Sequence, residues 1–202
     1  MFTGIIEKTG IIKEIISEGT NKSFWVESSL AQELKIDQSL SHNGVCLTVE
    51  EINNGMHRVT AIQETLLKTN LSTCTNDTII NLERCMMMNG RLDGHIVQGH
   101  VDCTAECIKV VEKDGSWEFS FVFPEKFAAL VIEKGSVCVN GISLTAFNVS
   151  SNSFTVAIVP YTYNHTNIKN TGLNSLVNIE WDLLGKYILR QTELLLLRQP
   201  VL

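Results

Sequence analysis

The sequence has 202 residues, of which 44% are hydrophobic and 19% are charged, so it can bury the core of one large domain or of two small ones. Its formal net charge is −6 and its basic residues are scattered, which argues against nucleic acid or an anionic membrane as a partner. No apolar run is long enough to span a membrane, and we expect no membrane association.

The stretch from Met1 to Glu7 lacks the charged start and long apolar region of a secretory signal, so we expect a cytoplasmic protein. The 6 cysteines include no Cys-x-x-Cys pair, which makes a zinc knuckle or a dithiol redox motif unexpected. In the cytoplasm these side chains should remain thiols, and most should be small buried residues.

In chain order, short stretches rich in β-branched residues and bounded by Gly, Asn or Ser predict a chain made mostly of β-strands. The strands expected in the first half cover residues 10–16, 24–27, 45–52, 58–62 and 78–82. Those expected in the second half cover residues 107–111, 117–123, 137–147, 154–159 and 176–181. Hairpin turns are expected at Asn53-Asn54-Gly55 and Asn152-Ser153. Close spacing of strands and turns indicates small closed barrels rather than a parallel sheet.

Few helices are expected. Ser29-Leu30-Ala31-Gln32 has the pattern of a capping box, and Pro124 fits the first position of a helix over residues 125–133. Apolar side chains at 184, 187, 188, 194 and 195 predict a helix over residues 184–197 with one apolar stripe. Such a helix commonly packs on its own domain, but both barrels are complete without it, so we favour a role in subunit association.

The sequence also repeats itself. Ser41-His42-Asn43-Gly44-Val45-Cys46-Leu47-Thr48 aligns with Cys138-Val139-Asn140-Gly141-Ile142-Ser143-Leu144-Thr145 at an offset of 97 residues. When residues 39–84 are aligned with 136–181, 11 of 46 positions are identical, where unrelated sequences would share roughly three. The identical pairs are Ser39/Ser136, Asn43/Asn140, Gly44/Gly141, Leu47/Leu144, Thr48/Thr145, Val59/Val156, Thr65/Thr162, Thr69/Thr166, Asn70/Asn167, Asn81/Asn178 and Glu83/Glu180. The starts of the halves align as well, Gly4 to Thr9 with Gly99 to Thr104, so we infer two homologous halves.

Generic signatures such as Gly-x-Gly-x-x-Gly, a phosphate-binding loop, Gly-x-Ser-x-Gly or His-Glu-x-x-His are absent from the sequence. The chain instead carries a set of unusual strings, which are Met1-Phe2-Thr3-Gly4-Ile5-Ile6-Glu7, Asn43-Gly44-Val45-Cys46-Leu47-Thr48-Val49, Glu64-Thr65-Leu66, Asn81-Leu82-Glu83-Arg84, Gly94-His95-Ile96-Val97-Gln98-Gly99-His100-Val101-Asp102 and Asn140-Gly141-Ile142-Ser143-Leu144-Thr145. In this order and spacing, from residue 1 to about residue 190, the chain resembles the riboflavin synthase family.

The resemblance implies an all-β fold of two tandem six-stranded Greek-key β-barrels, each binding lumazine or flavin, over residues 1–95 and 96–183. A C-terminal oligomerisation helix over residues 184–202 would drive formation of a homotrimer. The implied activity is that of a transferase of riboflavin biosynthesis, which dismutates two molecules of 6,7-dimethyl-8-ribityllumazine to riboflavin and 5-amino-6-ribitylamino-uracil. Neither a metal nor an organic cofactor is expected. The active site is expected between the N-terminal barrel of one subunit and the C-terminal barrel of its neighbour.

By the same resemblance, the catalytic residues are His100, Cys46, Ser143 and Thr145. His100 stands where the first half has Ile5, and a polar group in place of an isoleucine favours function over a structural role. It is expected near the methyl group that loses a proton, with Thr145 as its hydrogen-bond partner. Cys46 and Ser143 occupy matched positions, although an inert buried thiol is the alternative for Cys46. His95 is interpreted as structural.

The resemblance also implies a substrate-binding set in both halves. In the first half this set comprises Phe2, Gly4, Ile5, Ile6, Ser39, Cys46, Leu47, Thr48, Thr60, Ala61, Ile62, Gln63, Glu64 and Thr65. In the second half it comprises Gly99, His100, Val101, Lys134, Asn140, Ser143, Leu144, Thr145, Val159, Pro160, Tyr161, Thr162, Tyr163 and Asn164. Thr48 and Thr145 should bond the ring edges and Glu64 the ribityl hydroxyls. Strand propensity is the alternative for the threonines, and a turn is the alternative for Ser39.

Three positions depart from the family pattern. Asn140 stands where some relatives carry aspartate, so no carboxylate base is assigned there. Tyr161 stands at the position of Glu64, which predicts that the two pockets hold the ribityl chain differently. Nothing in the sequence explains Asp93 in place of a glycine.

Two other functions are weighed against the enzyme. A non-catalytic chromophore carrier of the lumazine protein type would share the fold, but such proteins typically lack the nucleophile and histidine positions. Here Cys46, His100, Ser143 and Thr145 are all present, which favours the enzyme. A purely structural barrel protein would not need two matched polar strings.

Overall fold

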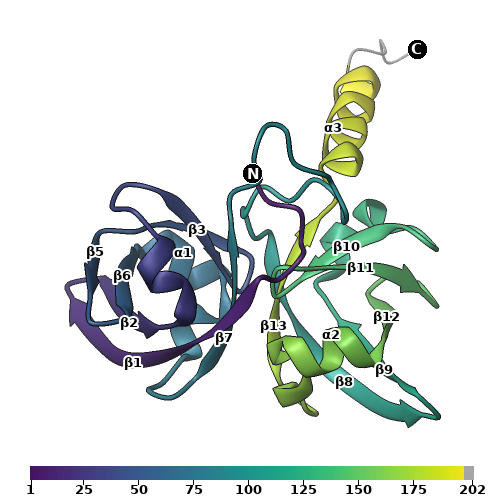
Figure 1. Ribbon diagram of the computed structural model, residues 1–202. Helices are drawn as coiled ribbons and strands as arrows, with labels where there is room; N and C mark the ends of the chain where they lie inside the picture. Colours follow the sequence, from purple (N-terminus) through teal and green to yellow (C-terminus); the bar gives the residue numbers. More distant parts are fainter. Residues whose placement is uncertain (198–202) are drawn as a thin grey trace.

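The structure, a computed structural model, describes residues 1–197 and contains two β-barrel domains side by side, with one helix projecting from the second (Figure 1). The first domain contains β1 (Lys8–Glu18), β2 (Asn21–Glu27), β3 (Ser39–His42), β4 (Val45–Thr48), β5 (Glu51–Asn53), β6 (Met56–Ala61) and β7 (Ile79–Arg84). The second contains β8 (Cys103–Lys113), β9 (Ser116–Val122), β10 (Ser136–Val139), β11 (Ile142–Phe147), β12 (Ser153–Ile158) and β13 (Leu176–Trp181). The predicted all-β fold in two halves is confirmed.

The second domain is a closed six-stranded barrel with the strand order β10-β11-β12-β9-β8-β13. It closes where β10 pairs with β13, with Val137 opposite Trp181. Alternate side chains along the strands point inward, and Phe121, Phe154 and Trp181 are buried in this core. The rings of Phe154 and Trp181 meet edge to face with their centroids 6.0 Å apart, a favourable aromatic arrangement.

The first domain follows the same path, but one of its strands is interrupted. Its sheet has the order β4-β3-β7-β1-β2-β6-β5, with β4 paired to β3 and β5 paired to β6. In the second domain the single strand β11 makes both kinds of pairing, first with β10 and then with β12. The predicted strand over residues 45–52 is divided into β4 and β5, with Val49 and Glu50 between them. The N–H groups of these two residues donate to Gln38 O and Arg58 O. The continuous closed barrel predicted for both halves is therefore observed only in the second.

Two Asn-Gly turns form hairpins at matched positions of the halves. Asn43 and Gly44 connect β3 to β4, and Asn140 and Gly141 connect β10 to β11. All four residues have positive φ, between 47° and 82°, which is the conformation that favours Asn-Gly in two-residue hairpins. The predicted strand over residues 137–147 is consequently a hairpin, and strand β3 was not predicted.

The short helices also differ from the prediction. Ser29–Glu33 forms the 3-10 helix η1, but no side chain caps it, so the predicted capping box was wrong. Glu125–Leu130 forms the 3-10 helix η3, and Pro124 is its N-cap rather than its first residue. Four further segments were not predicted, namely α1 (Gln63–Lys68), η2 (Asn70–Thr73), α2 (Pro160–His165) and η4 (Asn167–Asn170).

A reciprocal network of asparagines joins the two domains. The backbone N–H of Asn70 donates to Oδ1 of Asn178 at 2.6 Å, and that of Asn167 donates to Oδ1 of Asn81 at 2.7 Å. The members of the network, all buried, are Asn43, Asn70, Asn81, Asn140, Asn167 and Asn178. They form three of the identical pairs in the repeat, and most of their contacts are matched in the two halves. Hydrogen bonds between these buried amides fix the relative placement of the barrels, although Oδ1 of Asn70 accepts none within the described residues.

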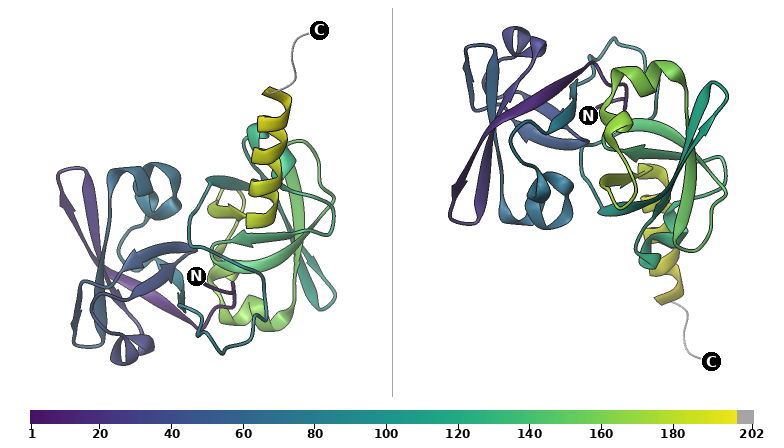
Figure 2. Two further views of the ribbon diagram at one scale, coloured as in Figure 1. Left: turned by 90° about the horizontal axis from the view of Figure 1, so that it is seen from above. Right: turned by 90° about the horizontal axis from the view of Figure 1, so that it is seen from below.

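Helix α3 (Leu183–Leu197) projects from the second barrel away from both domains, as the two views of Figure 2 show. None of its residues is buried, and its exposed apolar side chains include Leu184, Tyr187 and Ile188. The predicted helix is confirmed over residues 184–197, whereas residues 198–202 of the predicted segment lie outside the described residues. Within residues 1–197, no helix combines the length and apolar character that crossing a bilayer requires.

Candidate active site

Two extended segments cross between the barrels (Figure 1). Residues 1–7, the N-terminal crossing segment, and residues 96–102, the linker crossing segment, pair in antiparallel orientation at Phe2 and Val97. The Phe2 N–H donates to Val97 O at 2.7 Å, and the Val97 N–H donates to Phe2 O at 3.1 Å. Phe2 is 0% exposed in a small core with Cys138 and part of Cys46, so the structure places it beneath the segments rather than on a pocket surface.

A buried glutamate holds each crossing segment from the last strand of the same half. Glu83 on β7 accepts hydrogen bonds from the N–H groups of Thr3 (2.7 Å) and Gly4 (3.0 Å). Glu180 on β13 accepts the three N–H groups of residues 98–100 at 2.6 to 2.9 Å. Burial raises the pKa of both carboxyl groups, while these hydrogen bonds act in the opposite direction. The identical pair Glu83/Glu180 therefore fixes the backbone of both segments.

Each crossing segment then reaches the barrel of the other half. The Cys46 N–H donates to Gly99 O at 2.9 Å, and the Ser143 N–H donates to Gly4 O at 2.8 Å. Both glycines have positive φ. A Cβ atom added to Gly99 would lie 2.5 Å from the Cβ of Cys46, and one added to Gly4 would lie 2.6 Å from the Cβ of Ser143. Only glycine fits at these two positions. Ile6, two positions after Gly4, packs against the core of the second barrel, and Val101, two positions after Gly99, packs against the core of the first.

The N-pocket is a cavity of about 460 Å³ between the first barrel and the linker crossing segment. Its lining residues are Val45, Cys46, Glu64, Thr65, Lys68, Thr69, Gln98, Gly99, His100, Val101, Asp102 and Lys186. Cys46 from β4 and His100 from the crossing segment, two of the four predicted catalytic residues, line it together. The volume lies within the range of small-molecule sites.

Charged side chains surround the N-pocket in pairs. Glu64 and Lys68 form an ion pair within α1. Nζ of Lys186, at the base of α3, lies 2.6 Å from Oδ2 of Asp102, and these two side chains are only 23% and 20% exposed. The second pair connects the projecting helix to the linker crossing segment, and through it to the N-pocket.

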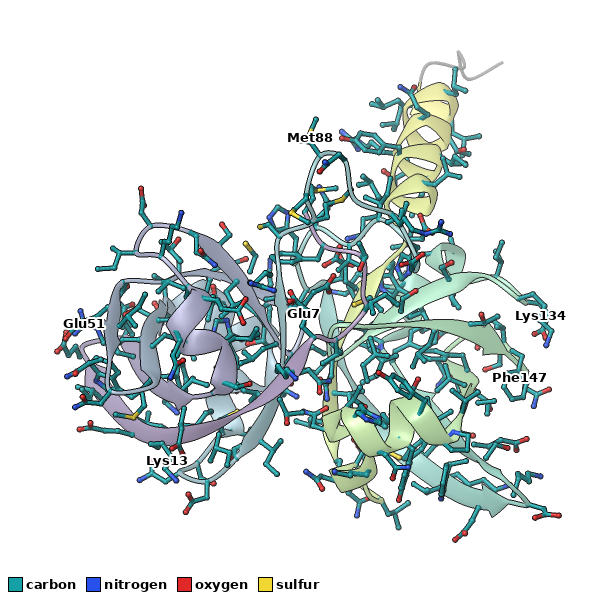
Figure 3. The ribbon with its side chains drawn as sticks, in the orientation of Figure 1. Glu7, Lys13, Glu51, Met88, Lys134 and Phe147 are labelled. Atoms are coloured by element: carbon teal, nitrogen blue, oxygen red, sulfur yellow. The ribbon has the colours of Figure 1, made fainter. Side chains whose placement is uncertain are left out.

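The C-pocket is a cavity of about 470 Å³ at the mouth of the second barrel. Its lining residues are Lys134, Ser143, Leu144, Thr145, Phe147, Ala157, Ile158, Val159 and Thr162. The other two predicted catalytic residues, Ser143 and Thr145, line it from β11. Nζ of Lys134 lies 5.0 Å from the centroid of the Phe147 ring, and Figure 3 shows both side chains at the outer end of this barrel.

The predicted hydrogen bond between His100 and Thr145 does not form within the described part of a single chain. His100 lines the N-pocket, and Thr145 lines the C-pocket. The segment that carries His100 docks on the first barrel, so the two residues lie in different pockets of one chain. The pairing was expected for a site between two subunits, and it stays a prediction.

Several predicted substrate-binding residues lie outside both cavities. Asn140 is 4% exposed, and its Oδ1 accepts the N–H of Asn178 at 2.8 Å in the junction network. Ser39 lines a different cavity, of about 730 Å³, whose other lining residues come from the N-terminal crossing segment, the first barrel and residues 85–93. The hydroxyl of Thr60 donates to Glu50 at 2.9 Å. Asn140 and Thr60 thus have structural hydrogen bonds, and Ser39 lies in another cavity, so their positions do not require a role in substrate binding.

The remaining predicted residues line neither the N-pocket nor the C-pocket, and Ile5 among them lines the same cavity as Ser39. The exposed members are Ile5, Thr48, Ile62, Gln63, Pro160, Tyr161 and Asn164, the partly buried members are Ile6 and Tyr163, and the buried members are Leu47 and Ala61. Ile62 and Val159, which occupy equivalent positions in the halves, are 55% and 57% exposed. Each barrel therefore has an exposed apolar residue at this matched position, where it is the N-cap of α1 or of α2.

One contact at the C-pocket was not predicted. Nδ1 of His95 lies 2.6 Å from Oγ of Ser143, and His95 is 8% exposed. The two residues are 48 positions apart, and no motif in the sequence links them. The histidine interpreted as structural thus touches a predicted catalytic residue.

All 6 cysteines are free thiols. Burial raises the pKa of Cys103 to about 12 and that of Cys74 to about 11, so both remain protonated and unreactive. Cys46 differs from these two cysteines in lining the N-pocket. Within residues 1–197, no three histidine, cysteine or acidic side chains are grouped so as to hold a metal ion.

Known proteins share both the sequence and the fold. The lumazine binding domain family matches residues 3–85 and 98–182, one match for each barrel. A riboflavin synthase of Actinobacillus pleuropneumoniae is 37% identical over 201 residues, which cover 99% of this chain and 92% of that protein. A riboflavin synthase of Bacillus amyloliquefaciens is 36% identical over 191 residues, which cover 94% of this chain and 89% of that protein.

Among solved structures, LumP in complex with riboflavin has a TM-score of 0.84 at 19% identity, over 90% of this chain and 99% of that one, which shows a shared fold. The two matched domains and the similarity over nearly the whole length place the chain in the riboflavin synthase family of transferases.

Proposed function

We propose that the protein transfers a four-carbon unit between two molecules of 6,7-dimethyl-8-ribityllumazine and releases riboflavin and 5-amino-6-ribitylamino-uracil. The observation that carries the proposal is the presence of two pockets with Cys46 and Ser143 at matched positions. A reaction between two copies of one molecule needs two related binding sites. A duplicated chain with exchanged crossing segments supplies them.

The chemistry depends mainly on orientation. A base removes a proton from the C7 methyl group of one molecule, and the resulting carbanion is delocalised over the electron-poor ring. A nucleophile that adds to C7 of the other molecule prepares it for coupling with this carbanion. The two products together contain all the atoms of the two substrates, so the overall reaction consumes no external oxidant or reductant. We therefore keep the expectation that no metal or organic cofactor takes part, with positioning as the largest contribution to rate.

We assign roles by position in the pockets. His100, exposed in the N-pocket, exchanges the methyl proton. Cys46 beside it is the nucleophile or orients one. Ser143 and Thr145 bond the heterocycle in the C-pocket. Glu64, at the exposed edge of the N-pocket, accepts hydrogen bonds from ribityl hydroxyls.

We further propose that the working site forms where the N-pocket of one subunit meets the C-pocket of a neighbour in a homotrimer. Leu67 on α1 and Tyr161 on α2 are 79% and 73% exposed, near the exposed N-cap residues Ile62 and Val159 of these helices, and clustered exposed apolar groups mark contact surfaces. Closure of the two mouths would exclude water and bring His100 towards Thr145 of a neighbouring subunit, a pairing that one chain does not make. The exposed apolar side chains of α3 supply a second contact, and we place the protein, with its free thiols, in the cytoplasm.

The second candidate function is that of a non-catalytic lumazine or flavin carrier. The fold supports it, because LumP, which binds riboflavin in its crystal structure, has the same architecture. The presence of Cys46 and His100 together in one pocket, with Ser143 and Thr145 in the other, favours the enzyme.

Joint assembly of two inactive variants tests the proposal. His100→Ala removes the proton-transfer group of the N-pocket and Thr145→Val removes a polar group of the C-pocket, so a trimer of either variant alone should be inactive while still binding riboflavin. In randomly mixed trimers a site is intact when its N-pocket comes from the Thr145→Val chain and its C-pocket from the His100→Ala chain. Each of these two conditions is met in half of the cases, so about one quarter of the sites are intact.

About a quarter of the wild-type activity should therefore return in the mixture, which fluorescence of the riboflavin formed would measure. A mixture as inactive as its components, beside an active wild type, would place each complete site within one chain.

A further inference from the structure

His95 directly precedes the linker crossing segment and lies beside the C-pocket. Its N–H donates to Thr3 O at 3.1 Å, and its Nδ1 lies 2.6 Å from Oγ of Ser143. His95 is not itself part of the C-pocket lining, whereas Ser143 is. The imidazole therefore reaches the pocket only through the serine hydroxyl.

The serine is enclosed on several sides. A Cβ atom on Gly4 would lie 2.6 Å from the Cβ of Ser143, and one on Gly94 would lie 3.0 Å from its Oγ and 2.0 Å from Thr3 O. The backbone of both segments is thus pressed against this side chain. A serine hydroxyl otherwise rotates among three staggered positions, and a hydrogen bond of 2.6 Å selects one of them.

The equivalent residue of the first half has a different environment. Cys46 shares the N-pocket with His100, and within residues 1–197 its sulfur has no hydrogen-bond partner. His100 therefore lines the N-pocket without a hydrogen bond to Cys46, while His95 is within hydrogen-bond distance of Ser143, the matched residue of the C-pocket. The two halves are alike in fold but differ in how their matched side chains are held.

Burial lowers the pKa of His95, so its ring is neutral near neutral pH and has one donor and one acceptor nitrogen. Whichever of these faces Ser143, the hydroxyl keeps either its proton or its lone pairs for a ligand in the C-pocket. A fixed hydroxyl of this kind can bond one polar edge of a heterocycle without first losing rotational freedom.

We propose that His95 is a positioning residue: it holds the Ser143 hydroxyl in the direction that bonds the heterocycle bound in the C-pocket. The proposal rests on the proposed function, because it assumes that the C-pocket receives one of the two lumazine molecules.

A double-mutant cycle on the complete protein tests this role. The variants are Ser143→Ala, His95→Leu, His95→Asn and the double variant His95→Leu/Ser143→Ala. Asparagine can place a polar atom where Nδ1 stands, whereas leucine cannot. Ser120→Ala is the matched control, since it removes a hydroxyl bonded to Thr155 at 3.0 Å in the same barrel and away from the pocket lining.

We expect Ser143→Ala and His95→Leu each to lower kcat/KM for 6,7-dimethyl-8-ribityllumazine by about 10-fold, the effect of one lost hydrogen bond. The double variant should be no worse than Ser143→Ala, and His95→Asn and Ser120→Ala should stay within about 3-fold of wild type. Additive losses in the double variant, or equal losses for the asparagine and leucine variants, would show that His95 acts only on folding. If the wild type itself fails to convert the lumazine, the proposed function fails instead.

Discussion

Gly44 and Gly141 touch each other across the junction of the two barrels. A Cβ atom on Gly44 would lie 2.8 Å from the backbone nitrogen of Gly141, and one on Gly141 would lie 2.8 Å from that of Gly44. Both residues also have positive φ as the second residue of an Asn-Gly turn. The most recognisable string of the repeat is thus a turn and an interdomain contact at once, and it carries Cys46 and Ser143 two residues further on.

This contact predicts a specific stability loss. Gly44→Ala or Gly141→Ala should lower the free energy of unfolding by about 2 kcal/mol or more, since positive φ costs an L residue about 1–2 kcal/mol and the backbone clash adds to it. Gly55→Ala is the matched control, because Gly55 has φ +77° but nothing within 4 Å of the added Cβ. Urea unfolding of the three variants would measure the difference. Equal losses at all three positions would mean that the contact does not strain the junction.

The buried histidine pair of the first barrel predicts sensitivity to acid. Nε2 of His42 lies 2.8 Å from Nε2 of His57, where the second barrel has Val139 and Phe154. Burial lowers the pKa of both histidines, that of His57 to about 4. Because His57 binds a proton below about pH 6.5 in the unfolded chain but only below about pH 4 in the folded chain, stability should fall as the pH falls through this window, and the lowered pKa of His42 acts in the same direction. For His57 alone the loss amounts to about 3 kcal/mol.

The double variant His42→Val/His57→Phe, which copies the second barrel, should lose less stability between pH 7 and pH 5 than the wild type does. Urea unfolding at both pH values would measure this, with replacement of the exposed His165 by Gln as the control. An unchanged pH dependence would show that the pair is not the acid-sensitive element.

The two buried glutamates predict selective loosening of the crossing segments. Glu180→Gln replaces an acceptor of three N–H groups by an amide whose own donors face them, at a cost of about 1–3 kcal/mol. Hydrogen–deuterium exchange should rise at the amides of residues 98–100, which Glu180 binds, and stay unchanged at those of Thr3 and Gly4, which Glu83 binds. Glu83→Gln should give the reverse pattern, so each variant is the control for the other. Equal increases of exchange in both crossing segments, in both variants, would contradict the claim that each glutamate anchors only its own segment.

The projecting helix predicts the assembly state. Leu184→Glu/Ile188→Glu places two charges on side chains that are 68% and 58% exposed in one chain, and should convert the proposed trimer to smaller species in sedimentation velocity. Leu173→Glu, at a leucine of similar exposure (66%) outside the helix, should leave the assembly unchanged. A trimer that survives the double substitution would remove α3 from the assembly.

The sequence was sufficient to predict the two halves and most strands, because β-branched stretches and an ungapped repeat are local signals. The helices α1 and α2 were missed since six residues are too few to show helical periodicity. Pro160, at the first turn of α2, was the one available signal.

The site was predicted less completely than the fold. The repeat aligned Gly4 with Gly99, but no local pattern reveals on which barrel a segment docks. That choice depends on contacts such as Gly99 with Cys46, between residues far apart in the chain. The same limit explains why the contact of His95 with Ser143 was missed.

Turnover of the substrate tests the central claim most directly. Purified protein incubated with 6,7-dimethyl-8-ribityllumazine, in the presence of a metal chelator, should consume two molecules of lumazine for each riboflavin formed and release one molecule of the pyrimidine product. Absorbance and fluorescence follow both compounds in one sample. Tight binding of the lumazine without conversion would make the protein a carrier, and conversion abolished by the chelator would contradict a reaction carried out by the side chains of the two pockets alone.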